Sequence, residues 1–229
     1  MKPKQFFYAY SLLSVLHLLA HLIGYEAVIT FTKPLLMVAL ALYFIYSVGL
    51  KTKTHLLIFI GLIFSQLGDT FLMYGAGDMN FFMVGIGAFL VTQCLYSIAF
   101  YSYHADKQGF LTKNKIFILP FALFLMEMLY VLLPILPSPL KIPVAIYSTV
   151  IVLMNVMALN LKTKMQPQHW RILMYGTLLF LLSDTLIAVN KFLMPLPMEG
   201  FLIMSTYLTG QLMIVEAFRK EKENPAEIA

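Results

Sequence analysis

Long apolar stretches alternate along this chain with short polar connections. Eight stretches approach the 17–25 apolar residues, roughly, that a helix needs to cross a bilayer. They lie near residues 6–24, 34–50, 55–74, 80–103, 115–136, 140–161, 170–191 and 199–218. We therefore predict an all-α polytopic integral membrane protein, with a single eight-helix transmembrane domain over residues 1–218 and a short charged tail over residues 219–229.

Two of the predicted spans carry the same polar insertion, an aspartate followed by threonine. Asp69 lies eight residues after Gly61, and Asp184 lies eight residues after Gly176. Each carboxylate comes 14 residues after the predicted start of its span, which is about 21 Å along a helix. Because a charged side chain at the centre of a bilayer costs at least about 2.5 kcal/mol, two aspartates in one pattern and at one depth indicate a functional site.

The positive charges divide unequally between the two sides of the predicted bundle. Thirteen of the 16 Lys and Arg residues share the side of the two chain ends: Lys2, Lys4, Lys51, Lys53, Lys107, Lys113, Lys115, Lys162, Lys164, Arg171, Arg219, Lys220 and Lys222. The other side holds Lys33, Lys141 and Lys191. Since cytoplasmic loops retain an excess of Lys and Arg, both termini are expected in the cytoplasm.

Composition supports the membrane class and limits the partners. The 229 residues are 60% hydrophobic and 12% charged, with a mean hydropathy of +0.82, which leaves too little polar surface for a water-soluble domain. The net charge of +5 follows from the topology, and we expect no nucleic-acid partner. The single cysteine, Cys94, excludes an internal disulfide and a cysteine-based metal site.

Further polar residues approach the layer of the two aspartates. Tyr147, Tyr207 and Gln211 lie in the same outer half of their spans, and Gln93 and Asn155 lie somewhat deeper. Lys191 follows Asp184 by seven residues, close to two helical turns, and Lys33 precedes Pro34 at the predicted start of the second span. These two lysines suit an anionic lipid headgroup at the rim, although snorkelling to the interface explains each of them equally well.

One alternative site and two alternative functions stay open. His17 and His21 share one helical face and, with Glu127 or an aspartate, contain the ligand types for zinc; hydrogen bonding between helices explains them as well. Paired intramembrane aspartates also suit a small proton- or sodium-coupled transporter, and a non-enzymatic lipid-binding protein is a third alternative. Serine-hydrolase, nucleotide-binding and dinucleotide motifs are absent from the sequence, and no cofactor is expected.

Two segments carry a resemblance to a known family. Phe64-Ser65-Gln66-Leu67-Gly68-Asp69 and the segment 179–188, which contains Phe180, Ser183 and Asp184, resemble the YhhN-like membrane proteins, which include the lysoplasmalogenases. Lys33-Pro34, Tyr207 and Gln211 agree with the family, and the resemblance covers essentially the whole chain. The chain departs from many relatives in the fourth span, where Gln93 stands in place of an expected histidine.

The resemblance implies hydrolysis of the vinyl ether bond of lysoplasmalogens to a fatty aldehyde and a glycerophospho-base. Such a bond needs an acid that protonates carbon and an anion that stabilises the resulting cation, roles that Asp69 and Asp184 can divide. We expect Asp69 as the acid and Asp184 as the ionised group, with substrate contacts from Lys33, Ser65, Gln93, Tyr147, Asn155, Ser183, Lys191, Tyr207 and Gln211. The partners are a lysophospholipid substrate and membrane lipid. The expected location is the inner membrane of a bacterium or the endoplasmic reticulum of a eukaryote, and a homodimer stays open.

Overall fold

The computed structural model describes residues 3–74 and 78–221, and within them it is built from helices. Eight of these helices are long and apolar enough to cross a membrane, which confirms the predicted class. The α-helices are α1 (Pro3–Ile23), α2 (Glu26–Val48), α3 (Lys53–Tyr74), α4 (Met79–Ser102), α5 (Leu119–Ile135), α6 (Ser138–Asn160), α7 (Pro167–Ala188) and α8 (Glu199–Lys220). Short 3-10 helices η1 (Phe110–Thr112), η2 (Lys115–Ile118) and η3 (Leu161–Thr163) and a π-helix η4 (Val189–Leu193) complete the described elements.

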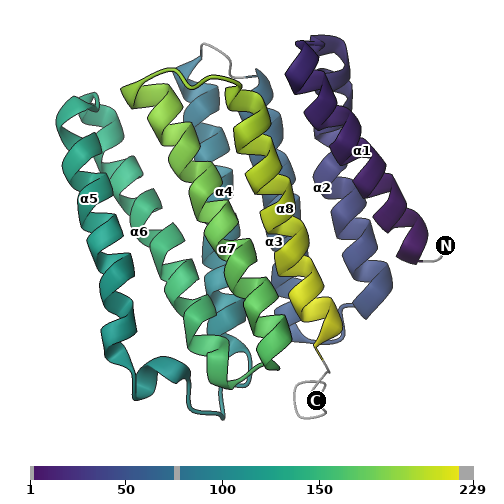
Figure 1. Cartoon of the computed structure of the whole chain (residues 1–229), viewed down its shortest axis with the longest axis vertical. Coiled ribbons are helices and arrows are strands. Elements are labelled where there is room, and N and C mark those ends of the chain that lie inside the picture. Colours follow the sequence, from purple (N-terminus) through teal and green to yellow (C-terminus); the bar gives the residue numbers. More distant parts are fainter. Residues whose placement is uncertain (1–2, 75–77, 222–229) are drawn as a thin grey trace. The chain divides into compact units, whose positions relative to one another are not determined.

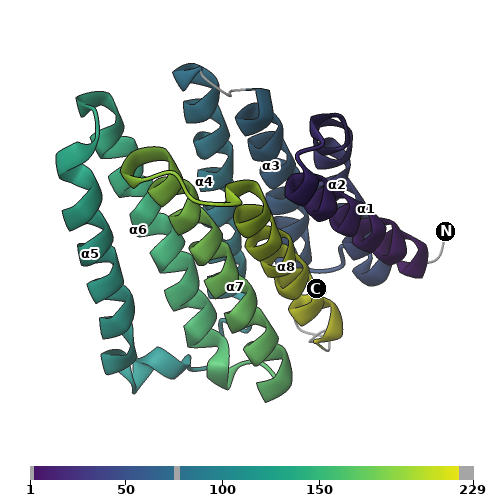
Figure 2. The ribbon, with the colours of Figure 1, turned by 45° about the horizontal axis from the view of Figure 1, so that its top comes forward.

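The described helices form two compact units, divided between Ala99 and Phe100 near the end of α4. In the first unit, α2 packs against both α1 and α3, and the helices follow one another in chain order (Figure 2). In the second unit, α5, α6, α7 and α8 also stand side by side in chain order (Figure 1). Short connections between long helices produce this up-and-down arrangement.

Glycines allow α3 and α4 to approach each other closely in the first unit. A Cβ atom at Gly61 would overlap the ring of Tyr96, and one at Gly68 would lie 2.6 Å from the ring of Phe89. Small residues serve this purpose in membrane helices, where close packing replaces the hydrophobic effect as the source of helix association. Gly61 and Gly68 thereby fix the position of Asp69 along the neighbouring helix α4.

Helices α7 and α8 pack backbone to backbone in the second unit. A Cβ atom at Gly210 would lie 2.8 Å from the Gly176 carbonyl oxygen and 3.0 Å from the Phe180 amide nitrogen. Closer to the end of α7, Ser183 Oγ donates a hydrogen bond to the Ile203 carbonyl oxygen at 3.1 Å. These contacts fix the register between the helix that carries Asp184 and the helix that carries Tyr207 and Gln211.

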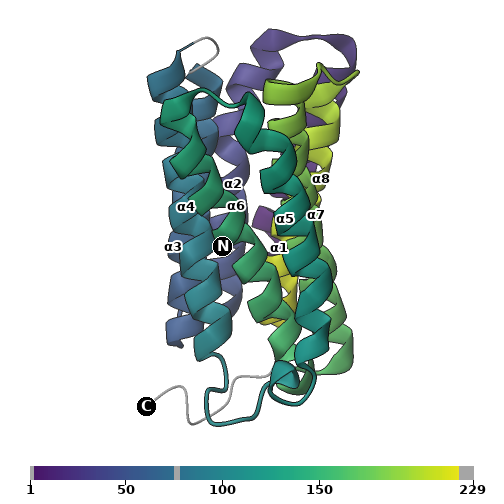
Figure 3. The ribbon, with the colours of Figure 1, turned by 90° about the vertical axis from the view of Figure 1, so that its left-hand side faces the viewer.

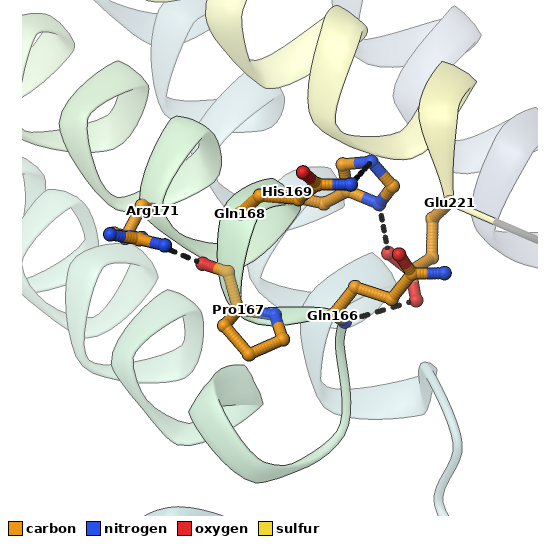
Figure 4. Close-up of polar contacts among 6 residues, drawn as sticks. All are labelled: Gln166, Pro167, Gln168, His169, Arg171 and Glu221. Carbon is orange, nitrogen blue, oxygen red and sulfur yellow. Dashed lines mark hydrogen bonds and ion pairs between the residues drawn. The ribbon is translucent and has the colours of Figure 1, made fainter.

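Polar contacts hold the opposite end of the second unit, where α7 begins and α8 ends. His169 Nδ1 lies 2.6 Å from Glu221 Oε2, and the Gln166 amide donates to Glu221 Oε1 at 3.2 Å (Figure 4). The side chains of His169 and Glu221 are only 8% and 9% exposed. The pair ties the last described residue of the chain to the first turn of α7.

The segment that leads into α5 folds against the end of α6 (Figure 3). Asn160 Oδ1 accepts a hydrogen bond from the Leu111 amide at 3.0 Å, and Lys164 Nζ donates to the Tyr103 carbonyl oxygen at 3.3 Å. Burial of the Lys164 ammonium lowers its pKa below the ordinary value. This connection therefore contains a buried lysine just outside the membrane-length helices.

The structure corrects the predicted start of the second span. Helix α2 begins at Glu26, and Pro34 lies inside it, eight residues beyond its start. Membrane helices tolerate an internal proline because neighbouring groups can satisfy the freed carbonyl. Lys33 is consequently about 10 Å along α2 and does not precede the helix.

The charged tail predicted over residues 219–229 falls largely outside the described residues. Arg219 and Lys220 form the last turn of α8, where Glu216 binds both of them, Arg219 at 2.8 Å and Lys220 at 3.2 Å. Residues 222–229 lie outside the described part of the chain.

Candidate functional site

A short polar contact between α6 and α7 in the second unit involves a predicted catalytic residue. The Tyr147 hydroxyl on α6 donates a hydrogen bond to Asp184 Oδ2 on α7 at 2.5 Å, between side chains that are both half-buried. This length is typical of a hydroxyl that donates to an ionised carboxylate. The position of Tyr147 along its predicted span placed it in the layer of the aspartates, and the structure identifies Asp184 as its hydrogen-bond partner.

Ser183, Tyr207 and Gln211 surround the contact between α7 and α8. All three are buried, and the Tyr207 ring packs edge-on against Phe180 with centroids 5.7 Å apart. Because its hydroxyl donates to the Ile203 carbonyl oxygen, Ser183 has a structural role in joining the two helices. Tyr207 and Gln211 are one turn apart on α8 and therefore share a face.

Asn155 lies on α6 eight residues beyond Tyr147, about 12 Å further along the helix. Its side chain is fully buried, and Nδ2 donates to the Ile151 carbonyl oxygen at 2.9 Å. Among the described residues, Oδ1 has no hydrogen-bond partner. A buried amide oxygen in this position can accept a hydrogen bond from a ligand or from water.

Lys191 does not occupy a regular α-helix. It is an exposed residue of the π-helix η4, which continues α7 beyond Ala188. Since a π-helix has more residues per turn, the count of two turns between Asp184 and Lys191 does not hold over the last three residues. The regular-helix count behind the predicted shared face of Asp184 and Lys191 therefore does not extend through η4.

Asp69 lies on α3 in the first unit, and its side chain is buried. It comes 16 residues after Lys53, where α3 begins, and Asp184 comes 17 residues after Pro167, where α7 begins. The two aspartates thus have nearly equal depth in their own helices. The carboxylate of Asp69 is near enough to the fully buried Tyr10 of α1 to interact with it electrostatically.

Ser65 and Gln93 flank the contact between α3 and α4. Ser65 Oγ donates to Thr92 Oγ1 at 3.2 Å, and Thr92 Oγ1 donates to the Gly61 carbonyl oxygen at 3.0 Å. Gln93 follows Thr92 and is fully buried. The hydrogen bonds make Ser65 part of the helix contact one turn before Asp69.

A polar cluster joins α1 to α2 in the first unit. His17 Nδ1 lies 2.7 Å from Thr32 Oγ1, and His21 Nε2 lies 3.3 Å from His17 Nε2. Lys33, half-buried on α2, is near enough to affect His17 electrostatically. Within the described residues, no three side chains of histidine, cysteine, aspartate or glutamate are grouped as a metal site requires, and Glu127 is exposed midway along α5.

Sequence reasoning missed Tyr10, Thr32 and Thr92. A signal for Tyr10 was present, because Tyr10, Ser14, His17 and His21 recur at spacings of four, three and four residues, which is one face of a helix. Thr32 and Thr92 have no comparable signal, since a lone threonine in an apolar span usually bonds its own backbone. Their partners become evident only from the packing of neighbouring helices.

The fold and these side chains define an integral membrane protein with eight membrane-length helices in its described part and an aspartate within two of them. The chain belongs to the YhhN family, whose model matches residues 28–218.

Two curated relatives are similar to most of the chain. The protein named lysoplasmalogenase TMEM86A of Homo sapiens is 32% identical over 173 residues, a match that covers 74% of this chain and 68% of the human protein. The protein of the same name from Bos taurus is 34% identical over 169 residues, with 72% of this chain and 66% of the bovine protein covered. The matched region thus spans about two thirds of the length of each relative. No solved structure matches the chain significantly.

Proposed function

We propose that this protein is a lysoplasmalogenase that hydrolyses the vinyl ether bond of lysoplasmalogens, with Asp69 and Asp184 as its acid and base. The enzyme class is supported by family membership and by the names of the two relatives. The observation that supports the role of the aspartates is the hydrogen bond from Tyr147 to Asp184, because it orients a carboxylate inside a membrane-length helix.

The environments of the two carboxylates suggest how they divide the chemistry. Tyr147 donates to Asp184 and thereby stabilises its ionised form. Asp69 is more deeply buried than Asp184, and burial away from water favours a neutral, protonated carboxyl group. We assign the proton donor to Asp69 and the base to Asp184.

The first step transfers the carboxyl proton of Asp69 to the β-carbon of the vinyl ether. The electron pair of the double bond forms the new C–H bond, and the positive charge spreads over the α-carbon and the ether oxygen. Water then attacks the α-carbon while the Asp184 carboxylate takes one of its protons, which gives a hemiacetal. Asp69 is ionised and Asp184 is protonated at this stage.

The second step breaks the hemiacetal. Asp184 returns its proton to the departing glycerol oxygen, and Asp69 removes the proton of the hemiacetal hydroxyl as the carbonyl forms. The products are a fatty aldehyde and a glycerophospho-base, one water is consumed, and both aspartates regain their initial protonation. At least one of the two aspartates is therefore ionised at every stage.

The remaining predicted residues belong to this proposal as substrate contacts. Lys33 and Lys191 would bind the anionic headgroup, and the polar residues within the helices would contact the glycerol backbone or the water: Ser65, Gln93, Tyr147, Asn155, Ser183, Tyr207 and Gln211. The excess of Lys and Arg on the predicted side of the two chain ends supports a topology with both termini in the cytoplasm.

The proposed function is tested by incubation of the purified protein with three lysolipids that share one headgroup and chain length. These carry a vinyl ether, an ester or a saturated ether at the same position. We expect a fatty aldehyde from the vinyl ether alone, with one deuterium on the carbon next to the carbonyl when the reaction runs in D₂O. Release of fatty acid from the ester, or no aldehyde from the vinyl ether, would overturn the proposal.

A further inference from the structure

His17 and His21 form a histidine pair that the proposed chemistry does not use. They lie on the last two turns of α1, with ring centroids 4.8 Å apart and ring planes at 82°. His17 is fully buried, whereas His21, one turn closer to the end of α1, is half-buried. The pair is thus anchored in the helix contact and extends toward the end of the first unit where α1 meets α2.

Hydrogen bonds determine the orientation of this pair. The Thr32 hydroxyl donates its proton to the Val28 carbonyl oxygen at 2.7 Å. It can therefore only accept from His17, so that Nδ1 of His17 carries the proton across the 2.7 Å contact. In neutral His17 the lone pair is then on Nε2, and it accepts a hydrogen bond from Nε2–H of His21.

This arrangement fixes the orientation of the His21 ring, because Nε2 of His21 has a partner in Nε2 of His17. With Nε2–H bonded to His17, a second proton on Nδ1 of His21 can be donated to an anion, whose negative charge in turn favours the protonated ring. Lys33 is near enough to act on His17 electrostatically, so a cationic lysine and an oriented imidazole occupy the same end of the first unit. A lysine ammonium and an imidazole N–H can both donate hydrogen bonds to the oxygens of a singly charged phosphodiester.

We propose that His21, oriented by His17 and Thr32, binds the phosphodiester of the lysolipid headgroup together with Lys33. The inference rests on the proposed function, since it assigns the phosphate of that substrate to a place in the fold. His21 is a binding residue that touches the headgroup. His17 and Thr32 act through His21 and are positioning residues.

The test compares two vinyl ether substrates of equal chain length, an alkenyl-glycerophosphoethanolamine and the phosphate-free alkenylglycerol. We expect H21Q and K33M to raise KM for the phosphate-bearing substrate about tenfold or more, as for loss of a hydrogen bond to a charged group. The variants should leave kcat and the KM for alkenylglycerol nearly unchanged. T32V should raise KM for the phosphate-bearing substrate by a smaller factor. H21R should restore the preference for the phosphate-bearing substrate. K53M, at the start of α3, is the control and should keep the KM values of wild type.

Three results would overturn the inference. The first is an equal change of KM for both substrates in folded H21Q, and the second is loss of kcat at unchanged KM, which would place His21 in the chemistry. The third is inhibition of wild type and H21Q to the same degree by inorganic phosphate, which would show that the anion binds elsewhere. If wild type releases aldehyde from neither substrate, the proposed function fails. Binding of the saturated-ether lysophospholipid and of alkylglycerol to the same variants then decides the phosphate site separately.

Discussion

The Tyr147 hydroxyl lies 2.5 Å from Asp184 Oδ2 and joins α6 to α7 across 37 residues of sequence. The contact supplies a hydrogen-bond donor to a carboxylate that lies within a membrane-length helix. Because hydrogen bonds are stronger in a low-dielectric environment, this pairing gives the ionised form of Asp184 a partner where bulk water is scarce. It also restricts the rotamer of the side chain on which the proposed water attack depends.

Substitution Y147F removes this donor and keeps the ring. Hydrogen bonds to charged groups contribute about 1.5–3 kcal/mol, so we expect kcat for vinyl ether hydrolysis to fall about 10- to 150-fold. KM should change little, because the bond supports chemistry more than ground-state binding. Steady-state kinetics of the purified variant measure both values.

Tyr130 provides the matched control for this substitution, because its side chain on α5 is 82% exposed. Y130F should keep wild-type kcat. Equal activities of Y147F and Y130F would show that the contact with Asp184 has no part in turnover.

The contact between α7 and α8 predicts an effect on stability. In G210A the new methyl group meets the Gly176 carbonyl oxygen at 2.8 Å and the Phe180 amide nitrogen at 3.0 Å, and these backbone atoms cannot rotate away. Overpacking of this kind costs about 1–3 kcal/mol. We expect a lower Tm of the detergent-solubilised protein in a thermal unfolding scan.

Gly87 is the control position, since a Cβ atom there would meet nothing within 4 Å. G87A should leave Tm unchanged or raise it slightly, because alanine favours a helix by about 1 kcal/mol over glycine. A Tm of G210A equal to that of G87A would rule out the close backbone contact.

Lys164 predicts a pH dependence of stability. Burial lowers the pKa of Lys164 in the folded protein below the ordinary value of 10.5, so between these two values the unfolded chain binds more protons. The free energy of unfolding therefore rises with pH in that window, and the full penalty for the buried charge is present below the folded pKa. K164M removes this penalty at every pH.

Unfolding scans of wild type and K164M over a pH series up to about 10 test the sign of this effect. The Tm of wild type should rise relative to that of K164M as the pH approaches 10.5, the ordinary value of the lysine. A Tm difference between wild type and K164M that stays constant with pH, or a Tm of wild type that falls relative to that of K164M at high pH, would contradict a lowered pKa of Lys164.

The number and approximate extent of the helices could be predicted from sequence, because the length of an apolar run reflects the thickness of a bilayer. The start of α2 could not, since Lys33-Pro34 has the pattern of a helix N-terminus and its interior position depends on packing. The π-helix at Val189–Leu193 likewise has no signal in its residues. Local conformations of this kind are set by neighbouring helices.

For the candidate site, sequence predicted the depth of a residue but not its partner. Depth along a helix follows from a fixed rise per residue, and it placed Tyr147 and Asp184 in one layer. Which side chains meet depends on the rotation of each helix and on its neighbours, as the contacts of His17 with Thr32 and of Ser65 with Thr92 illustrate. The sequence pattern of α1 held part of this information in the shared face of Tyr10, Ser14, His17 and His21.

In the proposed mechanism the two aspartates act as one catalytic unit. The rate of aldehyde release by D69N, D184N and the double variant at saturating substrate tests this most directly. Asparagine keeps the shape of the side chain but can neither donate a proton at useful acidity nor carry charge. Each single variant should therefore lose about 10²–10⁴ in kcat, and the double variant should be little worse than the poorer single one. Near-normal aldehyde release by either folded single variant would contradict the two-aspartate mechanism.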